Sequence, residues 1–355
     1  MLSLRPVPRV RTLRCDVPRV KVKRILLVHL GCFGDAVMAT AVPRELRERL
    51  PNAEIVWLTT REAAELVHSH PAVDSLVVPR GGRAGALMAA LRLRRARADV
   101  AIDLEGSTLS GLVTWLSGAG IRLGHGDPGK ISSLFLTHTV RPQSTYVRAS
   151  ERSLEVLNLL NLTPASFEPL LSIDAWDLEA AALVLREAGL PSDAQFVAIG
   201  PGTSHPRDRW RARFWSTVVD SLHYKYGLAS VLLGSPQHTP LLRTIAERCG
   251  APTVVLGGRT TLPQAAAVIK ASRLFIGVDS GLVSLAVATK TPAVVVAGWP
   301  PRRTLPEERV TVVSPRLPWH RGVHFDRWTI DHLRPRHVVH TADGWLSNST
   351  PWARK

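Results

Sequence analysis

The segment Arg24–Arg44, RILLVHLGCFGDAVMATAVPR, decides the fold of the chain around it. A continuous apolar run, 25–30, leads into a Gly-Cys-Phe-Gly-Asp turn, and an amphipathic run follows. Apolar runs that end at glycine are typical of strands buried on both faces of a parallel sheet. The segment therefore predicts a strand, a glycine turn and a helix over 36–50, with Asp35 at the start of the helix.

The segment 161–169, which contains two prolines, is the predicted linker, and the same alternation occurs on both sides of it. Before it we expect strands at 25–30, 54–60, 74–78 and 99–106, and helices at 36–50, 61–68, 84–98, 108–116 and 150–160. After it we expect strands at 196–200, 228–233, 252–256, 273–277 and 292–297, and helices at 177–189, 211–226, 239–248, 262–270, 281–289 and 335–346. The glycine-rich segment 121–130 is expected to be a loop. Such alternation predicts an α/β fold of parallel sheets with helices on both faces.

The length of 355 residues and the apolar content of 45% favour two domains of about 150 residues each. We expect a basic arm at 1–23 and Rossmann-like, doubly wound domains at 24–174 and 175–330. A C-terminal helix and tail, 331–355, would pack back on the first domain. Because ligands of such sheets bind at the carboxyl ends of strands, we expect the function to lie in a cleft between the two domains.

The net charge of +16 favours anionic partners, either phosphorylated substrates or an anionic membrane surface. Arginine richness from genomic composition explains the charge equally well. The helix predicted at 84–98 has an arginine-rich exposed face. The sequence has no zinc-finger spacing and no RNA-binding signature, so no nucleic-acid partner is predicted. It assigns no oligomeric state.

The three cysteines, Cys15, Cys32 and Cys249, are scattered and form no CxxC motif. This usage predicts a reducing compartment and no cysteine metal site. The sequence has neither an apolar span of about 20 residues nor a signal core at its start. We therefore expect a cytoplasmic protein, with peripheral contact to the membrane as an additional hypothesis.

Asp35 has two interpretations of equal weight. An aspartate directly before a helix is a good N-cap. A carboxylate at the end of a buried strand is also placed to act as a general base. The spacing alone does not separate the two roles.

Two later turns predict a phosphate site. Gly200-Pro-Gly-Thr-Ser204 joins a strand to a helix, and Gly202, Thr203 and Ser204 offer hydroxyl and N–H groups to phosphate oxygens. Arg207, Arg209 and Arg213 add positive charge. The turn Asp279-Ser280-Gly281 precedes another helix, with Asp279 expected on sugar hydroxyls. The alternative is that the first is an ordinary turn and that Asp279 is an N-cap.

No metal site and no cofactor are predicted. The thirteen histidines include no HExxH motif, and the chain has no DxD motif and no P-loop. A histidine metal site at 68–70 or at His320 and His324 is the less favoured alternative.

These motifs together resemble those of the ADP-heptose:lipopolysaccharide heptosyltransferases, family 9 of the glycosyltransferases. The likeness is carried by 23–58, 73–78 with 103–111, 197–215 and 272–296. The resemblance implies a GT-B fold and an inverting, metal-independent enzyme. It would move a heptose-like sugar from a nucleotide-sugar, ADP-heptose by resemblance, to a lipopolysaccharide-core or other cell-envelope acceptor, either a glycan or lipid-linked.

The resemblance also implies roles for individual residues. Asp35 would be the base that deprotonates the acceptor hydroxyl. The donor contacts would be Gly202, Thr203, Ser204, Arg207, Arg209, Asp279, Ser280 and Gly281. The acceptor contacts would be Gly34, Arg61, Asp103, Gly106 and Ser110.

The chain departs from the family pattern at several positions. Asp208, between two arginines, replaces a lysine that neutralises the donor phosphates, and Gln237-His238 replaces a glutamate that binds nucleoside hydroxyls. The family histidine is lost at 283–286, and an acceptor-side lysine is lost around Leu109. Two alternatives therefore stay open: transfer to a small natural product, or binding of a nucleotide-sugar or glycan without catalysis.

Overall fold

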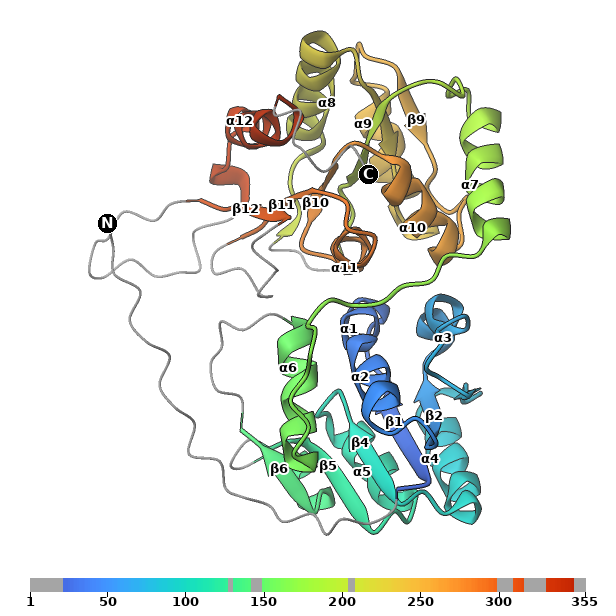
Figure 1. Cartoon of the computed structure of the whole chain (residues 1–355). Helices are drawn as coiled ribbons and strands as arrows, with labels where there is room; N and C mark the ends of the chain where they lie inside the picture. The colour runs from blue at the N-terminus through green and yellow to red at the C-terminus, as the bar shows by residue number, and fades with distance from the viewer. Residues whose placement is uncertain are drawn as a thin grey trace, which may run out of the picture. The chain divides into compact units, whose positions relative to one another are not determined.

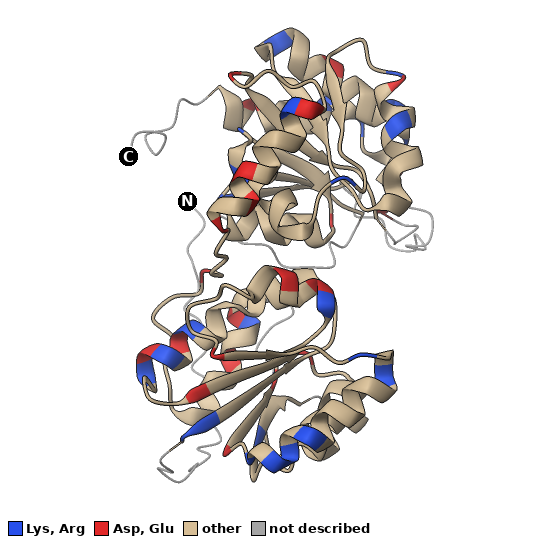
Figure 2. Ribbon diagram, turned by 90° about the vertical axis from the view of Figure 1, so that its right-hand side faces the viewer, with Lys and Arg blue, Asp and Glu red and all other residues tan. Residues whose placement is uncertain are grey.

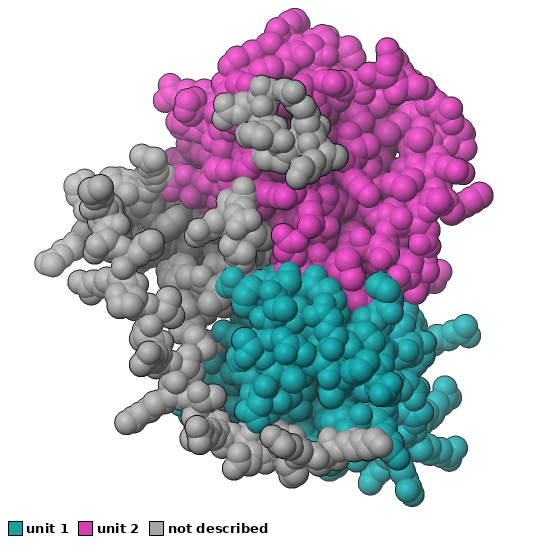
Figure 3. Space-filling model, in the orientation of Figure 1, with its two compact units in different colours: residues 1–31, 41–60, 71–167 teal, residues 32–40, 61–70, 168–355 magenta. Residues whose placement is uncertain are grey.

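The computed structural model describes residues 22–126, 130–141, 149–203, 208–298, 309–315 and 330–347. The chain forms two compact units (Figures 1 and 3). Unit 1 consists of residues up to 31 with 41–60 and 71–167, and unit 2 consists of 32–40, 61–70 and the chain from 168 onward. The predicted basic arm lies almost wholly outside the described residues.

Unit 1 contains a six-stranded parallel sheet with the order β3-β2-β1-β4-β5-β6. Its strands are β1 (Arg24–His29), β2 (Glu54–Thr59), β3 (Ser75–Val77), β4 (Val100–Asp103), β5 (Ile121–His125) and β6 (His138–Val140). The apolar run of β1 is buried because this strand lies in the middle of the sheet, between β2 and β4. This strand order is that of the Rossmann fold, with its switch point between β1 and β4.

The helices of unit 1 lie on both faces of its sheet. They are α2 (Ala41–Arg49), α4 (Gly82–Leu93), α5 (Thr108–Leu116) and α6 (Ala149–Glu155), with the 3-10 helices η1 (Arg94–Ala96), η2 (Ile131–Phe135) and η3 (Val156–Leu160). Alanines of α4 and Val113 of α5 share one core cluster with Leu26 and Val28 of β1. Helices α4 and α5 therefore cover the same face of the sheet.

Unit 2 contains a second six-stranded parallel sheet with the order β12-β11-β10-β7-β8-β9. Its strands are β7 (Phe196–Gly200), β8 (Ala229–Leu232), β9 (Thr253–Val255), β10 (Phe275–Val278), β11 (Ala293–Val296) and β12 (Val310–Val313). The order repeats that of unit 1, and the switch point falls between β7 and β10. The chain is thus an α/β protein with two doubly wound, Rossmann-like sheets, as predicted.

Unit 2 also includes two helices from early in the sequence. Its helices are α1 (Phe33–Ala39), α3 (Arg61–Val67), α7 (Ala175–Glu187), α8 (Ala212–Tyr226), α9 (Thr239–Ala246), α10 (Leu262–Ala271), α11 (Gly281–Ala288) and α12 (Pro335–Leu346), with η5 (Pro236–His238) and η7 (Ile330–His332). Helices α1 and α3 pack against each other, α1 against α11, and α3 against α10. The alternation pattern gives no sign of this arrangement.

The C-terminal helix packs within unit 2, whereas the sequence predicts its return to the first domain. Val338 and Ala342 of α12 are buried in the same core cluster as residues of α8. The Tyr226 hydroxyl donates to the Asp343 carboxylate over 2.7 Å. Helix α12 therefore belongs to the layer of helices that covers the sheet of unit 2.

The helix predicted at 36–50 is two helices, α1 and α2, separated at Thr40. Pro43 has no N–H group to donate to the carbonyl of Ala39, so one continuous helix would leave that carbonyl unpaired. The Thr40 hydroxyl donates to the Val37 carbonyl and accepts the N–H of Leu170. The side chain thereby stabilises the break.

The prediction of a loop over 121–130 is wrong for 121–125, which form β5. The glycines serve close packing rather than a turn. A Cβ atom on Gly124 would lie 2.9 Å from Cδ1 of Leu136, and one on Gly126 would lie 2.4 Å from Cβ of Thr139. The short strands β6 and β12 are also absent from the sequence prediction.

No helix among the described residues is both long enough and apolar enough to span a membrane.

Candidate functional site

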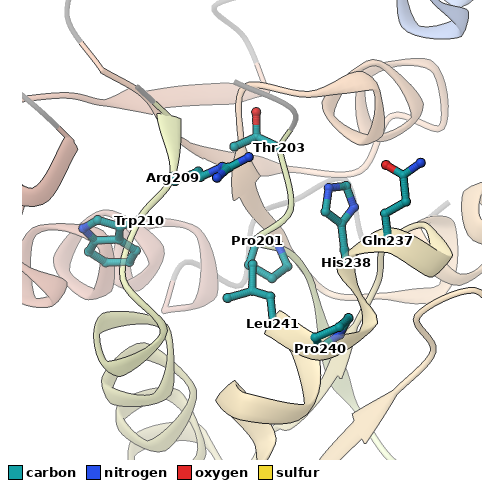
Figure 4. A pocket seen from close by; sticks show the side chains of 8 residues that line it. All are labelled: Pro201, Thr203, Arg209, Trp210, Gln237, His238, Pro240 and Leu241. Atoms are coloured by element: carbon teal, nitrogen blue, oxygen red, sulfur yellow. The ribbon is translucent and has the colours of Figure 1, made fainter. Parts of the chain in front are cut away.

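The turn after β7 opens onto a cavity of about 440 Å³ within unit 2 (Figure 4). The cavity is lined by Pro201, Thr203, Arg209, Trp210, Gln237, His238, Pro240 and Leu241. Its size is that of a site for a small organic ligand. One cation, one hydroxyl, one amide and one imidazole line it beside apolar groups, a set that suits an anion attached to a flat apolar ring system.

Gly202 allows the turn to approach the β8 side of the cavity closely. A Cβ atom on Gly202 would lie 2.4 Å from Cγ of His238, so no other residue fits here without moving the imidazole. The Nδ1 atom of His238 lies 3.0 Å from the Ser235 hydroxyl. This contact fixes the orientation of the imidazole ring. Figure 4 shows the ring beside Gln237 at the wall of the cavity.

The electrostatics of the cavity favour an anion. Burial, and after it the neighbouring Arg209 guanidinium, lower the pKa of His238, so its imidazole is neutral at neutral pH. Asp208, in the position of the family lysine, is buried and does not line the cavity, whereas Arg209 does. Among the described residues, the cavity wall therefore carries positive charge from Arg209 and no carboxylate.

The Asp279-Ser280-Gly281 turn lies at the end of β10, the strand beside β7. Both turns thus lie at the switch point of the second sheet, where ligands of doubly wound folds bind. A Cβ atom on Gly200 would lie 3.0 Å from Cδ1 of Leu282, which shows how close the two turns are. The Ser280 hydroxyl is buried without a hydrogen-bond partner among the described residues.

The N-cap interpretation of Asp279 is wrong. Ser280 is the N-cap residue of α11, and Asp279 precedes it. The first four N–H groups of an α-helix have no partner within the helix, so side chains, water or a ligand must satisfy them. The Ser280 side chain makes no capping bond, so it does not satisfy these N–H groups of α11.

The N-cap interpretation of Asp35 is also wrong. Helix α1 begins at Phe33 with Cys32 as its N-cap, so Asp35 is the third residue of the helix. Its side chain is exposed, and the Cys32 thiol donates to Oδ2 of Asp35 over 3.0 Å. The carboxylate therefore projects from the first turn of a helix that packs against α11, the helix of the Asp279 turn.

Asp103, Gly106 and Ser110 form one hydrogen-bonded turn at the end of β4 in unit 1. The Asp103 carboxylate is 0% exposed and accepts the N–H groups of Glu105 and Gly106 and the hydroxyl of Ser110. Burial raises its pKa to about 6 against the lowering effect of these bonds. Gly106 has φ +78°, a left-handed conformation that favours glycine. Asp103 thus holds the shape of the turn.

The remaining predicted residues are separate from this turn. Gly34 is buried in α1, and Arg61 is the exposed first residue of α3, with its Nε 4.0 Å from a Glu65 carboxylate oxygen. Ser204 and Arg207 lie outside the described residues. Arg213 lies on α8 with its guanidinium 5.0 Å from the centre of the Phe214 ring.

The cavity includes Trp210, Pro240 and Leu241, for which the sequence predicts no role in the site. The signal was the segment Gly234-Ser235-Pro236, a third glycine turn between a strand and a helix. Because it follows β8, the neighbour of β7, its residues reach the same edge of the sheet.

The model of the family described as glycosyltransferase family 9 (heptosyltransferase) matches residues 87–314 of the chain. The chain belongs to this family. It is therefore an enzyme of the glycosyltransferase class. The family assignment gives the two turns and the cavity of unit 2 a chemical context, because an enzyme of this class must bind an activated sugar.

Individual relatives agree with this assignment. Lipopolysaccharide heptosyltransferase 3 of Escherichia coli is 26% identical over 278 residues, 75% of this chain and 80% of that protein. A family 9 glycosyltransferase structure from Veillonella parvula has a TM-score of 0.80 at 20% identity and covers 95% of this chain and 99% of its own. The structure of E. coli ADP-heptose lps heptosyltransferase II has a TM-score of 0.71 at 23% identity and covers 91% and 98%. The fold is therefore the GT-B fold predicted from the sequence.

Proposed function

We propose that this enzyme transfers a heptose from ADP-heptose to a lipopolysaccharide-core acceptor, with inversion and without a metal ion. The observation that carries the proposal is the cavity beside Thr203 and Arg209, next to the Asp279 turn at the switch point of the second sheet. The names of the relatives, a lipopolysaccharide heptosyltransferase and an ADP-heptose enzyme, supply the donor and acceptor.

The donor nucleotide would occupy this cavity. Its base and ribose fit against the apolar groups and Gln237, while the diphosphate fits beside Thr203 and Arg209. The first turn of α11, which the Ser280 side chain does not cap, would offer N–H groups and the positive end of its dipole to the same phosphates. These groups stabilise the negative charge that the leaving ADP acquires.

Asp35 would act as the base. The acceptor hydroxyl oxygen forms a bond to the anomeric carbon from the side opposite the diphosphate. The bond from the anomeric carbon to the diphosphate oxygen breaks with its electron pair, which gives ADP. The hydroxyl proton passes to the Asp35 carboxylate. One displacement of this kind inverts the anomeric centre, through a transition state with oxocarbenium character.

Arg209 would replace the family lysine in this scheme. Asp208 is buried, while the following residue lines the cavity, so the positive charge at the phosphates is displaced by one residue along the chain. A guanidinium presents its N–H donors in a planar fork that matches two phosphate oxygens, whereas a lysine ammonium acts as a compact point charge.

A screen of nucleotide-sugars tests the proposal. The full chain is incubated with ADP-heptose, and in parallel with ADP-, GDP- and UDP-hexoses, on a lipopolysaccharide-core acceptor and on soluble small-molecule acceptors, and products are detected by mass spectrometry. We expect a product that carries one added heptose on the core acceptor. Transfer to small molecules alone would replace the acceptor assignment. Binding of ADP by calorimetry without any product would show that the protein binds the donor without catalysis.

A further inference from the structure

The outer layer of unit 1 has an unusual charge distribution. We use this name for α4, η1, α5 and η2, which follow one another over one face of the sheet. The segments 75–98, 106–126 and 130–141, which contain these elements, include no Asp and no Glu. Figure 2 shows the blue bands of arginines on the lower unit's long front helix, α4, without red bands. The layer is therefore purely cationic.

The arginines gather at the end of α4. Arg92, Arg94 and Arg95 are exposed, and no ion pair or hydrogen bond of their side chains is found among the described residues. A Cβ atom on Gly118, just after α5, would lie 2.9 Å from Cγ of Arg94. The cluster of charge thus lies at the junction of α4 with α5. Side chains without internal partners are available to an external anion.

The same layer exposes large apolar side chains. The exposed fractions are 81% for Leu134, 60% for Ile131, 50% for Trp115 and 44% for Leu91. Ile131 and Leu134 are three residues apart in η2, and side chains at this spacing in a 3-10 helix lie on the same side. Trp115 contacts Phe135 of η2, with ring centres 6.4 Å apart. Large apolar side chains grouped in this way mark an interaction surface.

The apolar groups are held outward by a rigid attachment. Gly111 of α5 allows η2 to approach closely, since a Cβ atom there would lie 3.0 Å from the Ser132 carbonyl oxygen. The Arg122 guanidinium donates to the carbonyls of Phe135 and Ala119 over 2.7 and 2.8 Å. Leu134 is therefore presented by a fixed element, and its exposure does not come from a loose loop.

We propose that the outer layer of unit 1 docks on the surface of an anionic phospholipid bilayer, with Ile131, Leu134 and Trp115 inserted among the headgroups. Arginines and exposed aliphatic and Trp side chains without carboxylates are the composition of interfacial membrane-binding surfaces. Aliphatic groups have no partner in a nucleic-acid backbone, which disfavours RNA. A second copy across a two-fold axis would bring arginines against arginines, which disfavours a dimer.

Docking would place unit 1 where a lipid-linked acceptor is found, but it does not depend on the sugar that is transferred. Vesicle binding is measured without donor or acceptor, so its result and that of the donor screen are independent. A failure of one leaves the other standing.

The test is co-sedimentation of the full chain with vesicles of phosphatidylcholine alone, or of phosphatidylcholine with about a third phosphatidylglycerol. One variant removes apolar groups, Ile131→Ser with Leu134→Ser. Another removes charge, Arg92→Gln, Arg94→Gln and Arg95→Gln. The matched controls lie in unit 2: Trp176→Ser with Leu183→Ser, and Arg186→Gln, Arg243→Gln and Arg248→Gln. All of these side chains are exposed, and circular dichroism checks that each variant is folded.

We expect the wild type to bind the phosphatidylglycerol vesicles and to be released by salt. The charge variant should bind up to about 100-fold more weakly, at roughly five-fold per arginine, and the apolar variant at least several-fold more weakly. The controls should bind like the wild type. No binding by the wild type, or an equal loss in the unit 2 charge variant, would overturn the proposal. So would binding of RNA that depends on these arginines without vesicle binding.

Discussion

The ring of Phe33 lies directly against Gly281: a Cβ atom on this glycine would stand 2.3 Å from Cζ of the ring. Phe33 opens the helix that carries Asp35, and Gly281 opens the helix that follows Asp279. Helix α1, which contains Asp35, and α11, which follows the Asp279 turn, pack against each other within unit 2. In the proposed reaction, this packing fixes the base relative to the donor turn.

Gly281→Ala should uncouple the two helices. The added methyl group cannot fit beside the Phe33 ring as it lies, so the ring or α1 must shift, at a cost of up to about 1–3 kcal/mol for such overpacking. We expect a lower stability in urea unfolding and a loss of transfer that exceeds the loss of ADP binding.

Phe33→Ala combined with Gly281→Ala is the matched test of this reason. Removal of the ring makes room for the methyl group, so the double variant should recover stability relative to the sum of the two single variants. Additive effects would show that the contact does not transmit the strain.

Asp35→Asn should abolish transfer while the protein stays folded. The side chain is exposed at the third position of α1 and is not its cap, so its loss costs the helix little. Loss of a general base lowers kcat by about 100- to 10,000-fold. Product formation from ADP-heptose is measured by mass spectrometry, with Cys32→Ala as control because this thiol contacts Asp35 but transfers no proton in the proposed scheme. Transfer near the wild-type rate in Asp35→Asn would exclude the carboxylate as the base.

Arg209→Gln should weaken the binding of ADP. The guanidinium lines the cavity, and loss of a hydrogen bond to a charged group corresponds to about a 10- to 100-fold change in Kd. Arg213→Gln is the matched control, because Arg213 lies over the Phe214 ring and does not line the cavity. Calorimetry that gives equal losses for both variants would assign the effect to net charge.

Acidification should strengthen ADP binding through His238. Burial and Arg209 lower the pKa of this imidazole, so it is neutral at neutral pH and gains its proton only under acidic conditions. A proton gained there adds positive charge beside the proposed diphosphate. His238→Gln cannot gain it, and the difference in Kd between the wild type and this variant should grow as the pH falls. A constant difference would place the phosphates away from the imidazole.

The sequence predicts most of the fold because the alternation of apolar strands with glycine turns is a local signal. It fails at β5, where Gly124 and Gly126 serve packing against residues more than ten positions later. The sequence also fails to predict where α1 packs. It predicts a helix over most of these residues, but the partner of that helix, α11, lies about 240 residues further along the chain.

The sequence predicts those site residues that belong to a recognisable glycine turn. Thr203 and Arg209 were assigned from glycine spacing and charge, and both line the cavity. Leu241 and Trp210 carry no such signal, since a leucine within a predicted helix and a tryptophan directly before one are typical of core residues. Only the parallel pairing of β7 with β8 brings their segments together.

Asp103→Asn should change how stability depends on pH. The carboxyl has its ordinary pKa of 3.8 in the unfolded chain, and burial raises the pKa to about 6 in the folded protein. Between these values the folded protein holds a proton that the unfolded chain has released. The wild type therefore loses stability as the pH rises through this range, by about 3 kcal/mol in total.

The asparagine variant keeps the turn but cannot titrate. The Oδ1 atom of the asparagine can accept the N–H groups of Glu105 and Gly106, as the carboxylate does in the wild type. In the wild type the Ser110 hydroxyl donates to the carboxylate, whereas in the variant the asparagine Nδ2 can donate to the oxygen of this hydroxyl. Urea unfolding at a series of pH values measures both proteins, and their difference cancels the other carboxyl groups. We expect the variant to gain stability relative to the wild type as the pH rises, with no further gain above the folded pKa. Parallel curves would show that Asp103 has the same pKa in the folded protein as in the unfolded chain, because its three hydrogen-bond donors offset the effect of burial.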